Sequence, residues 1–298
     1  MANAATRNAG GTAAARPAGP RRLRDDRPLT EPAPRRESAG AAVAPAAAGD
    51  PLPPLAVKTL GKALALLDAV GGLAHPPTIS EVAATTGLAR PTAYRLVQSL
   101  VAAGFLVQNP NDQRLGIGYA VLPLASSLLD RNRLRLEALP HLQTLAQRMN
   151  ERVNLGILNR ERVLILGGTE KPNLPTIYSR FGRTVPVHCC ALGKAILAFL
   201  PEAQARAILE AAPMTARTPR TITSLPNMLE ELALTRERGY AIERGENSQT
   251  SCCVAVPILV ADDEPVGAIS VSGRSIDALV ADIGAVLGTA ELISHRLR

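Results

Sequence analysis

The chain has 298 residues, and its 46% of hydrophobic residues are enough to build two ordinary domains, each with its own core. Aromatic residues make up 2% and Trp is absent, which argues against a platform that binds single-stranded nucleic acid by stacking. The four Cys form two adjacent pairs, so neither a disulfide scaffold nor a CxxC zinc site is expected. No apolar run of about 18 residues and no signal-peptide core occur, so we expect a cytoplasmic protein with no membrane span.

The formal net charge of +7 is unevenly distributed along the chain. It amounts to +3 over residues 1–50, +2 over 51–118 and +2 over 119–150, whereas residues 151–298 hold 16 basic and 16 acidic residues. A basic first half joined to a neutral second half is typical of a nucleic-acid-binding protein with a separate sensing or assembly domain.

Residues 1–54 are dominated by Ala, Arg, Pro and Gly. Such a segment buries too little apolar surface to offset the entropy of ordering it, so we interpret it as a disordered arm. In one interpretation its arginines add weak contacts to phosphate; in the other the arm is a solvated tail with no role of its own.

Residues 55–118 have the pattern of a small DNA-binding domain. The expected elements are three helices at about 57–72, 81–86 and 90–103, and a hairpin of strands at 105–108 and 114–117. Ser80 is the expected N-cap of the second helix, and Gly87 turns the chain into the third, with Pro91 in its first turn. Three helices followed by a hairpin predict a winged helix-turn-helix.

Residues 119–150 are expected to form a linker helix with a kink or break at Pro140. Beyond them, short β runs alternate with helices. The expected strands lie at 154–158, 162–166, 176–178, 240–242, 252–259 and 266–272, and the expected helices at 190–200, 202–211, 225–238 and 275–297. We therefore expect an α+β multidomain chain, in which residues 151–298 form a sheet domain with helices packed on it.

The third helix has an apolar stripe and an opposite face that we expect to contact DNA. Thr92, Arg95 and Ser99 lie at i, i+3 and i+7 and share that face, and Arg95 is the candidate for a bidentate contact to guanine. Tyr94 either packs its ring at the border of the core or contacts DNA. Residues at element edges are expected to contact phosphate. The full expected DNA-binding set is Lys58, Arg90, Pro91, Thr92, Tyr94, Arg95, Ser99 and Arg114. A winged helix used for protein contacts is the alternative.

Several features of the second half resemble parts of enzymes. Gly193-Lys194 lacks the flanking Gly and Ser or Thr of a Walker loop. His188 beside Cys189 has no third group to orient it as a base, and the spacing is unlike that of a zinc site. We interpret Cys189 and Cys252 as small buried apolar side chains. We therefore expect no catalytic residues, no metal and no cofactor.

A ligand pocket fits the same region better. Ser270 and Ser272 are two apart on a predicted strand, so both hydroxyls face the same way. Buried hydroxyls need partners, which are either a small polar ligand or the backbone and water. The turn at Ala191-Leu192-Gly193 begins a helix whose free N–H groups favour a carboxylate.

Six strings along the chain resemble the IclR family of bacterial transcriptional regulators. They are VKTLGKAL at 57–64, ISEVA at 79–83, TGLARPTAYRL at 86–96, PVHCCALGKA at 186–195, RERGY at 236–240 and GAISVSG at 267–273. They occur in the family's order and cover the chain from about Val57 onwards. The resemblance implies a winged-helix DNA-binding domain, a linker helix and a GAF-like effector-binding domain, assembled as homodimers or homotetramers.

The resemblance also implies which residues hold the effector. Carried onto this sequence, they are Ala191, Leu192, Glu243, Cys253, Ser270 and Ser272. The chain departs from the family where Ala191 replaces Gly of some members, where Glu243 replaces the common Asp, and where Ala89 replaces the Ser that often caps the third helix.

We therefore expect a ligand-responsive transcription factor and no enzyme. Its expected partners are double-stranded DNA with a palindromic operator, a small carboxylate or aromatic acid, and further copies of the chain. The alternatives are a Cys/His-dependent hydrolase or transferase with an appended DNA-binding domain, and a structural DNA-bridging protein that binds no ligand.

Overall fold

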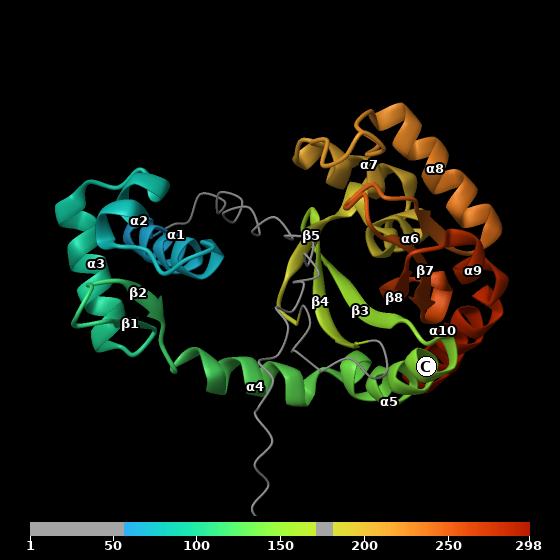
Figure 1. The fold of residues 1–298 in the computed structure, drawn as a ribbon, viewed down its shortest axis with the longest axis horizontal. Coiled ribbons are helices and arrows are strands. Elements are labelled where there is room, and N and C mark those ends of the chain that lie inside the picture. The colour runs from blue at the N-terminus through green and yellow to red at the C-terminus, as the bar shows by residue number, and fades with distance from the viewer. Residues whose placement is uncertain (1–56, 171–180) are drawn as a thin grey trace, which may run out of the picture. The chain divides into compact units, whose positions relative to one another are not determined.

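The computed structural model describes residues 57–170 and 181–298 (Figure 1). The expected arm at 1–54 and the expected strand at 176–178 lie outside the described residues. Among the described residues, no helix is both long enough and apolar enough to cross a membrane.

The first described elements form the expected winged helix-turn-helix. They are α1 (Lys58–Gly72), α2 (Ile79–Thr86), α3 (Arg90–Ala102), β1 (Leu106–Gln108) and β2 (Leu115–Ile117). The two strands are antiparallel, with Val107 opposite Gly116. Leu66, Val82 and Val97 from the three helices meet Leu106 and Leu115 from the hairpin in one buried cluster. On α1 the helical period is misleading: the helix buries Leu66, Ala69 and Val70, whereas Val57, Leu60 and Leu64, which the period selects, are exposed.

The N-cap of α2 is Thr78, so the expected cap at Ser80 is wrong. The Thr78 hydroxyl accepts a hydrogen bond from the Glu81 N–H, and the Glu81 carboxylate accepts one from the Thr78 N–H at 2.6 Å. This reciprocal capping box satisfies two donors, which moves the helix start two residues earlier than Ser80 alone suggests. At the other end, Gly87 adopts φ +66°, a left-handed conformation that favours glycine.

The linker is two helices, α4 (Val121–Arg131) and α5 (Arg133–Met149), and the break between them lies at Asn132. Of the kink or break expected at Pro140, the break is wrong, because α5 continues through that proline. The Asn132 side chain accepts a hydrogen bond from the Arg135 N–H at 2.8 Å and so starts a new helix. Beyond it, α5 buries Ala138 and Leu142 on both sides of Pro140, and this packing holds the helix together.

A six-stranded antiparallel sheet follows, with the strand order β5-β4-β3-β8-β7-β6. Its strands are β3 (Arg152–Asn159), β4 (Arg162–Thr169), β5 (Thr184–Pro186), β6 (Ala241–Glu243), β7 (Cys252–Leu259) and β8 (Pro265–Gly273). The short strand β5 was not expected from the sequence. Its three residues are too few to show a periodicity of two.

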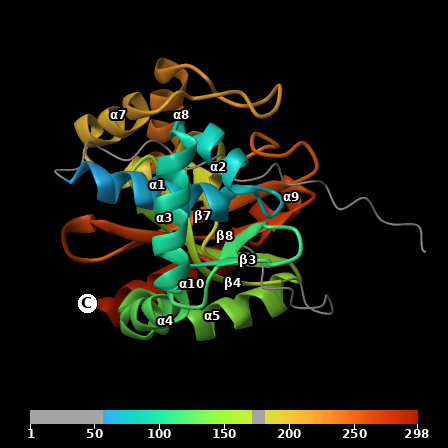
Figure 2. The ribbon, with the colours of Figure 1, turned by 90° about the vertical axis from the view of Figure 1, so that its left-hand side faces the viewer.

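Helices cover both faces of this sheet (Figures 1 and 2). One face carries α5 and α10 (Ile283–Leu297), and the other carries α6 (Ala191–Phe199), against which α8 (Leu225–Arg238) and α7 (Glu202–Ala211) pack. The C-terminal segment is α9 (Ile276–Ala281) and α10 rather than one long helix, because Asp282 leaves the helical region at φ −110° and ψ 24°. Two 3₁₀ turns, η1 (Val187–Cys189) and η2 (Ala261–Asp263), complete the described elements.

The sheet therefore separates two apolar cores. Val153, Val254 and Ile269 pack with α5 and α10, whereas Val163, Ala255 and Ala268 pack with α6 and α8. The expected mixed α+β architecture is confirmed, and the α6 face of the sheet is the one that carries polar side chains in the core.

Candidate functional site

The face of α3 that the sequence assigned to DNA lies on the surface. Arg90, Arg95 and Ser99 are exposed and Thr92 is half-buried, while Ala93 and Val97 on the other side are fully buried. The Ser99 hydroxyl donates to the Arg95 carbonyl oxygen at 3.0 Å, so its hydrogen is already used within the helix. The guanidinium groups of Arg90 and Arg95 are therefore the long, exposed hydrogen-bond donors of this face.

Tyr94 is 56% exposed, and this contradicts the interpretation that its ring packs at the border of the core. The position falls between Ala93 and Arg95, at the edge of the apolar stripe, where periodicity alone does not decide the side. The ring instead enlarges the exposed surface of α3.

Two of the basic residues expected to contact phosphate differ in their surroundings. Lys58 is exposed at the start of α1. Arg114, in contrast, donates from its guanidinium to the Pro76 carbonyl oxygen at 2.6 Å and lies 3.8 Å from the Glu81 carboxylate. Arg114 thus ties the β hairpin to the start of α2, a role in holding the module together that the sequence did not predict.

On the sheet, three of the residues expected to hold the effector form one row across β6, β7 and β8. Glu243 pairs with Cys253, and Cys253 pairs with Ser272. The Cys253 thiol donates to the Ser272 hydroxyl oxygen at 3.1 Å. Ser270 lies one pleat further along β8 and is buried, so all four side chains share the α6 face.

Glycines allow two close approaches at the start of α6. A Cβ on Gly156 of β3 would stand 2.9 Å from the Leu192 side chain of α6, and a Cβ on Gly193 would stand 2.2 Å from the Val187 carbonyl oxygen of the preceding turn η1. Ala191 and Leu192 are buried in the first turn. The Cys190 thiol caps the helix by accepting a hydrogen bond from the Gly193 N–H at 3.3 Å, an unusual cap that the sequence did not reveal.

Glu243 is a buried carboxyl group. Its Oε1 accepts hydrogen bonds from the backbone N–H groups of Glu246 and Asn247, the latter at 3.1 Å. Burial raises the pKa of Glu243 above its ordinary value, and the two backbone donors act in the opposite direction.

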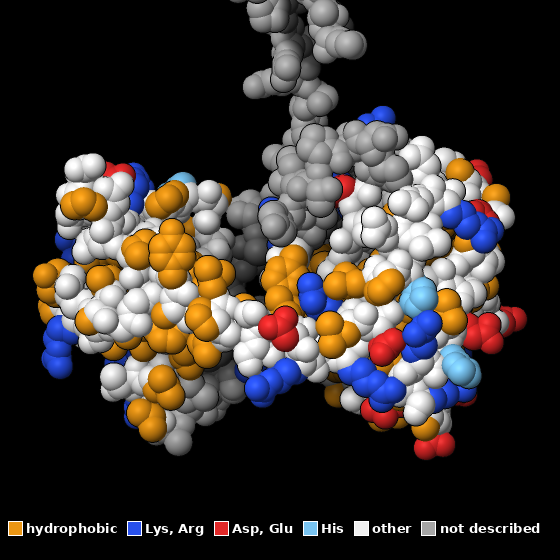
Figure 3. Space-filling model, turned by 90° about the horizontal axis from the view of Figure 1, so that it is seen from below, with side chains coloured by type: hydrophobic (Ala, Val, Ile, Leu, Met, Phe, Trp, Pro, Cys, Tyr) orange, Lys and Arg blue, Asp and Glu red, His pale blue; other side chains and the backbone are white. Residues whose placement is uncertain are grey.

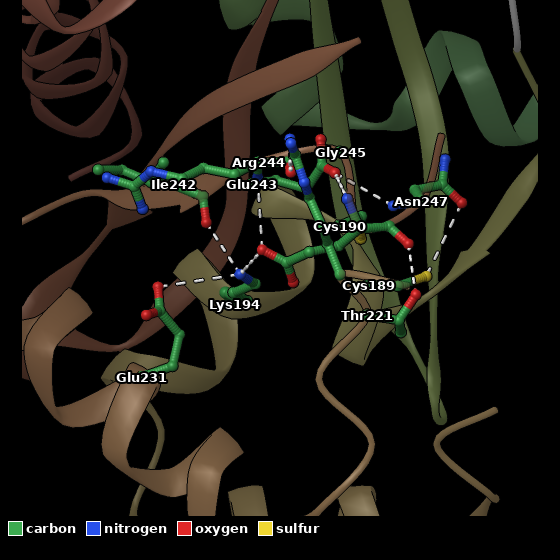
Figure 4. Close-up of polar contacts among 12 residues, drawn as sticks. Cys189, Cys190, Lys194, Thr221, Glu231, Ile242, Glu243, Arg244, Gly245 and Asn247 are labelled. Carbon is green, nitrogen blue, oxygen red and sulfur yellow. Dashed lines mark hydrogen bonds and ion pairs between the residues drawn. The ribbon is translucent and has the colours of Figure 1, made fainter. Parts of the chain in front are cut away.

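A buried lysine, Lys194, lies near Glu243 (Figure 4). From the sequence it was a candidate only for part of a Walker loop. The Lys194 side chain is 1% exposed, and its ammonium donates to the Ile242 carbonyl oxygen at 2.9 Å and to Glu246 Oε1 at 2.6 Å. Glu231 of α8 lies 3.8 Å away. One signal that could have found it is a single charge inside the apolar run ALGKAILAF. Lys194 joins α6 to β6 and to the loop that follows Glu243.

The segment 213–224 is hydrogen-bonded to the same loop. Thr218 donates to the Gly245 carbonyl oxygen and Thr221 to that of Glu246, each at 2.7 Å. The His188 Nε2 lies 3.1 Å from the Thr215 carbonyl oxygen. Burial lowers the pKa of His188, while this hydrogen bond acts in the opposite direction.

The described residues do not contain the arrangement that a Cys/His nucleophile requires. The His188 ring bonds to a backbone carbonyl, and the Cys189 thiol lies within hydrogen-bond reach of the Pro186 carbonyl oxygen and the Asn247 side chain. Burial raises the pKa of Cys189 to about 12, which keeps it a neutral thiol. Cys189 and Cys252 are both buried, as the sequence predicted. Over residues 57–170 and 181–298, no group of three or more His, Cys, Asp or Glu could hold a metal ion.

Comparison with known families matches both halves of the chain. The model of the bacterial transcriptional regulator IclR C-terminal domain matches residues 126–294, and the IclR helix-turn-helix domain matches residues 59–110.

Individual relatives agree with the family models. The HTH-type transcriptional regulator XynR of Escherichia coli is 31% identical over 80% of this chain and 96% of its own length. The crystal structure of the Thermotoga maritima IclR is 30% identical, covers 80% of this chain and 98% of its own, and superposes with a TM-score of 0.61. An IclR homologue from Microbacterium hydrocarbonoxydans, complexed with 4-hydroxybenzoate, is 26% identical over 80% of this chain and 99% of its own, with a TM-score of 0.68. The chain belongs to the IclR family of bacterial transcriptional regulators, with a helix-turn-helix and a C-terminal ligand-binding domain.

Proposed function

We propose that this regulator binds a palindromic operator and that a small organic acid controls this binding. The observation that supports the proposal best is the polar row Glu243, Cys253 and Ser272 beside the first turn of α6. Glu243, Cys253 and Ser272 have hydrogen-bond partners in the chain, and a row of polar side chains in an otherwise apolar core also offers a small polar ligand the groups that orient it. The first N–H groups of a helix have no partner within it, and at the start of α6 those other than the Gly193 N–H, which the Cys190 thiol accepts, favour a carboxylate.

The division of labour follows the charge and the surroundings of these residues. We assign residues 55–118 to DNA binding, 119–150 to a linker and 151–298 to effector binding. Arg90 and Arg95 on the exposed face of α3 are the proposed contacts to DNA, with Arg95 reading a base edge. The acid acts by changing how the DNA-binding modules of two copies are placed relative to each other. It changes operator affinity only as far as it binds the two placements with different affinity.

We further propose that the working form is a homo-oligomer. Leu122, Leu124 and Leu128 of α4 are 58%, 61% and 60% exposed, so this helix presents apolar side chains that nothing in the described part of the chain covers. On the face shown in Figure 3, hydrophobic side chains gather over the winged helix, whereas charged ones are interspersed over α5 and α10. Covering α4 with a second copy would bring two winged helices to two half-sites.

The relative from Microbacterium hydrocarbonoxydans supports the chemical class of the effector, since its structure was determined with 4-hydroxybenzoate. The identity of that ligand does not transfer to this chain. At Ala191 and Glu243, this sequence differs from residues common in the family, and each difference reshapes the site.

The test measures operator binding and effector binding together. Footprinting of the promoter regions beside the gene identifies the operator, and fluorescence anisotropy with that DNA then measures its affinity with and without a panel of organic acids. We expect at least one acid to change the Kd for the operator, and Ser272→Ala to weaken this response. Ser224→Ala is the control, because this serine precedes α8 and makes no capping hydrogen bond. If no acid in the panel changes operator affinity, the proposed function is wrong.

A further inference from the structure

A buried asparagine lies on the same sheet face as the proposed effector residues. Asn154 sits in β3 between Val153 and Leu155, whose side chains pack toward α5 and α10, so its own side chain points to the α6 face. Across the sheet it pairs with Ser270 on β8 and with Gly168 on β4. The residue is 4% exposed.

The carboxamide oxygen of Asn154 has no hydrogen-bond partner among the described residues, although it is buried. A buried polar atom left without a partner costs about 1–3 kcal/mol, and native proteins rarely keep such an atom without a reason. Ser270, its cross-strand neighbour, belongs to the proposed effector site. An acceptor that lacks a donor, beside a ligand-binding face, indicates that the ligand supplies the donor.

The Asn154 carboxamide lies over Gly168 of β4. A Cβ at Gly168 would stand 3.2 Å from Asn154 Oδ1 and 2.6 Å from the Val153 carbonyl oxygen, so the glycine at 168 allows the carboxamide to take this position. Two residues along β3, Gly156 lies under the Leu192 side chain of α6. The first turn of α6, where a carboxylate is favoured, is therefore one pleat of the strand away from Asn154.

We infer that Asn154 is a specificity-determining residue of the effector site and that the effector is a hydroxylated carboxylic acid. This inference rests on the proposed function. The carboxylate takes the backbone N–H groups at the start of α6, and the hydroxyl donates its hydrogen to Asn154 Oδ1. The two serine hydroxyls can either donate or accept, so they do not discriminate between ligands in this way. The carboxamide oxygen can only accept, and it therefore selects for an O–H group.

The test uses pairs of acids that differ in one hydroxyl: lactate with propionate, and 4-hydroxybenzoate with benzoate. Isothermal titration calorimetry on the full-length protein measures each Kd. We expect the hydroxylated member of at least one pair to bind about tenfold more tightly, the effect of one buried hydrogen bond. The analogue 4-methoxybenzoate, which keeps the oxygen but lacks the hydrogen, should bind no better than benzoate.

The variant Asn154→Leu keeps the branched shape and the number of side-chain heavy atoms and lacks the acceptor. We expect it to bring the two members of that pair to within about twofold of each other. Asn159→Leu, on the exposed end of the same strand, is the matched control and should keep the preference. Equal weakening of both members in Asn154→Leu would overturn the inference, as would a wild-type protein that binds acids but has no preference for the hydroxyl.

A second measurement needs no ligand. If Asn154 Oδ1 lacks a partner in the free protein, Asn154→Leu should leave the thermal unfolding midpoint unchanged or raise it. A clear fall in the midpoint would show that the carboxamide is already hydrogen-bonded, and would overturn the inference independently of the effector. Failure of every acid to bind contradicts the proposed function, and the inference with it, whereas binding without hydroxyl preference contradicts this inference alone.

Discussion

The winged helix and the α6 face of the sheet differ in the burial of their polar side chains. On α3, Arg90 and Arg95 are exposed and the fully buried residues are Ala93 and Val97. At the α6 face of the sheet, Lys194 and Glu243 are buried. The Lys194 ammonium donates to the Ile242 carbonyl oxygen of β6, and the Glu243 carboxyl accepts from the loop that follows it. The first arrangement suits contact with a long charged partner, because exposed charges meet phosphate and base edges without reorganising the core.

The second arrangement suits a small ligand that is enclosed. There, polar groups leave water when the protein folds, and most of their partners come from the chain itself. Substitutions in the two regions are therefore expected to change different measured quantities. Changes on α3 should alter DNA binding and leave folding intact, whereas removal of a buried, paired charge under α6 should alter folding first.

The largest effect is expected from Lys194→Met. The substitution removes the ammonium 2.6 Å from Glu246 and leaves that carboxylate buried without its partner. We expect the free energy of unfolding to fall by about 3–5 kcal/mol, measured by urea denaturation followed by circular dichroism. The control is Arg206→Met, which removes an exposed arginine from i,i+4 pairs with Glu202 and Glu210 and should change stability by less than about 0.5 kcal/mol. Similar losses in both variants would contradict the contrast between buried and exposed charge.

Arg95→Ala should produce the reverse pattern. Loss of a bidentate contact to guanine is expected to remove about 1–3 kcal/mol of discrimination between the operator and other DNA. The free energy of unfolding should stay within about 0.5 kcal/mol of wild type, since Arg95 is exposed. Footprinting and anisotropy measure the first quantity, and Arg206→Ala serves as a control distant in sequence. An unchanged footprint would show that this face of α3 has been assigned wrongly.

Helix capping allows a paired test within the winged helix. Ala89 precedes α3 and makes no side-chain capping hydrogen bond, so Ala89→Ser should stabilise the protein by about 1 kcal/mol. Thr78 caps α2 in a capping box, so Thr78→Ala should destabilise it by a similar amount. Thermal unfolding of the two variants tests both signs. A melting temperature unchanged by Ala89→Ser would mean that the start of α3 already has its donors satisfied.

The smallest effect is expected in the pH dependence of stability. Burial raises the pKa of Glu243 in the folded protein, so the native state binds more protons than the unfolded state between its ordinary value of 4.5 and the raised value. The contribution of Glu243 to stability therefore decreases as the pH rises through this window. Glu243→Gln should remove that decrease, which denaturation at a series of pH values will measure. Parallel curves for the two proteins would contradict it.

Much of the fold could be predicted from the sequence because its signals are local. The bounds of α7, α8 and β7 agree with the hydrophobic pattern, and the winged helix follows from the order and spacing of three short helices, two glycine turns and a hairpin. The mistakes occurred where a distant or reciprocal contact decides. Thr78 rather than Ser80 caps α2, because Thr78 and Glu81 exchange hydrogen bonds in a capping box. The helix α5 continues through Pro140, because residues on both sides of the proline are buried against the sheet.

The site was predictable only in part, for a similar reason. The resemblance named Glu243, Cys253 and Ser272, and the register of β6, β7 and β8 places them in one row. The helical period did not decide whether Tyr94 is buried, and the structure leaves it exposed. The sequence also did not show that the Arg114 guanidinium donates to the Pro76 carbonyl oxygen and lies near Glu81. Lys194, Asn154 and the Cys190 cap were missed, because their roles depend on strands and loops remote in sequence.

Local sequence patterns were sufficient for the order of the modules, the placement of the excess charge before residue 151, and the buried and exposed faces of α3. These features depend on composition and on periods of two and 3.6 residues, which any short window of the chain contains. Only the tertiary structure decided which polar side chains are buried and whether each has a partner. Burial and hydrogen bonding are properties of pairs of segments, so the lysine at 194 and the unpartnered oxygen at Asn154 became visible only when β3, β6, β8 and α6 were packed together.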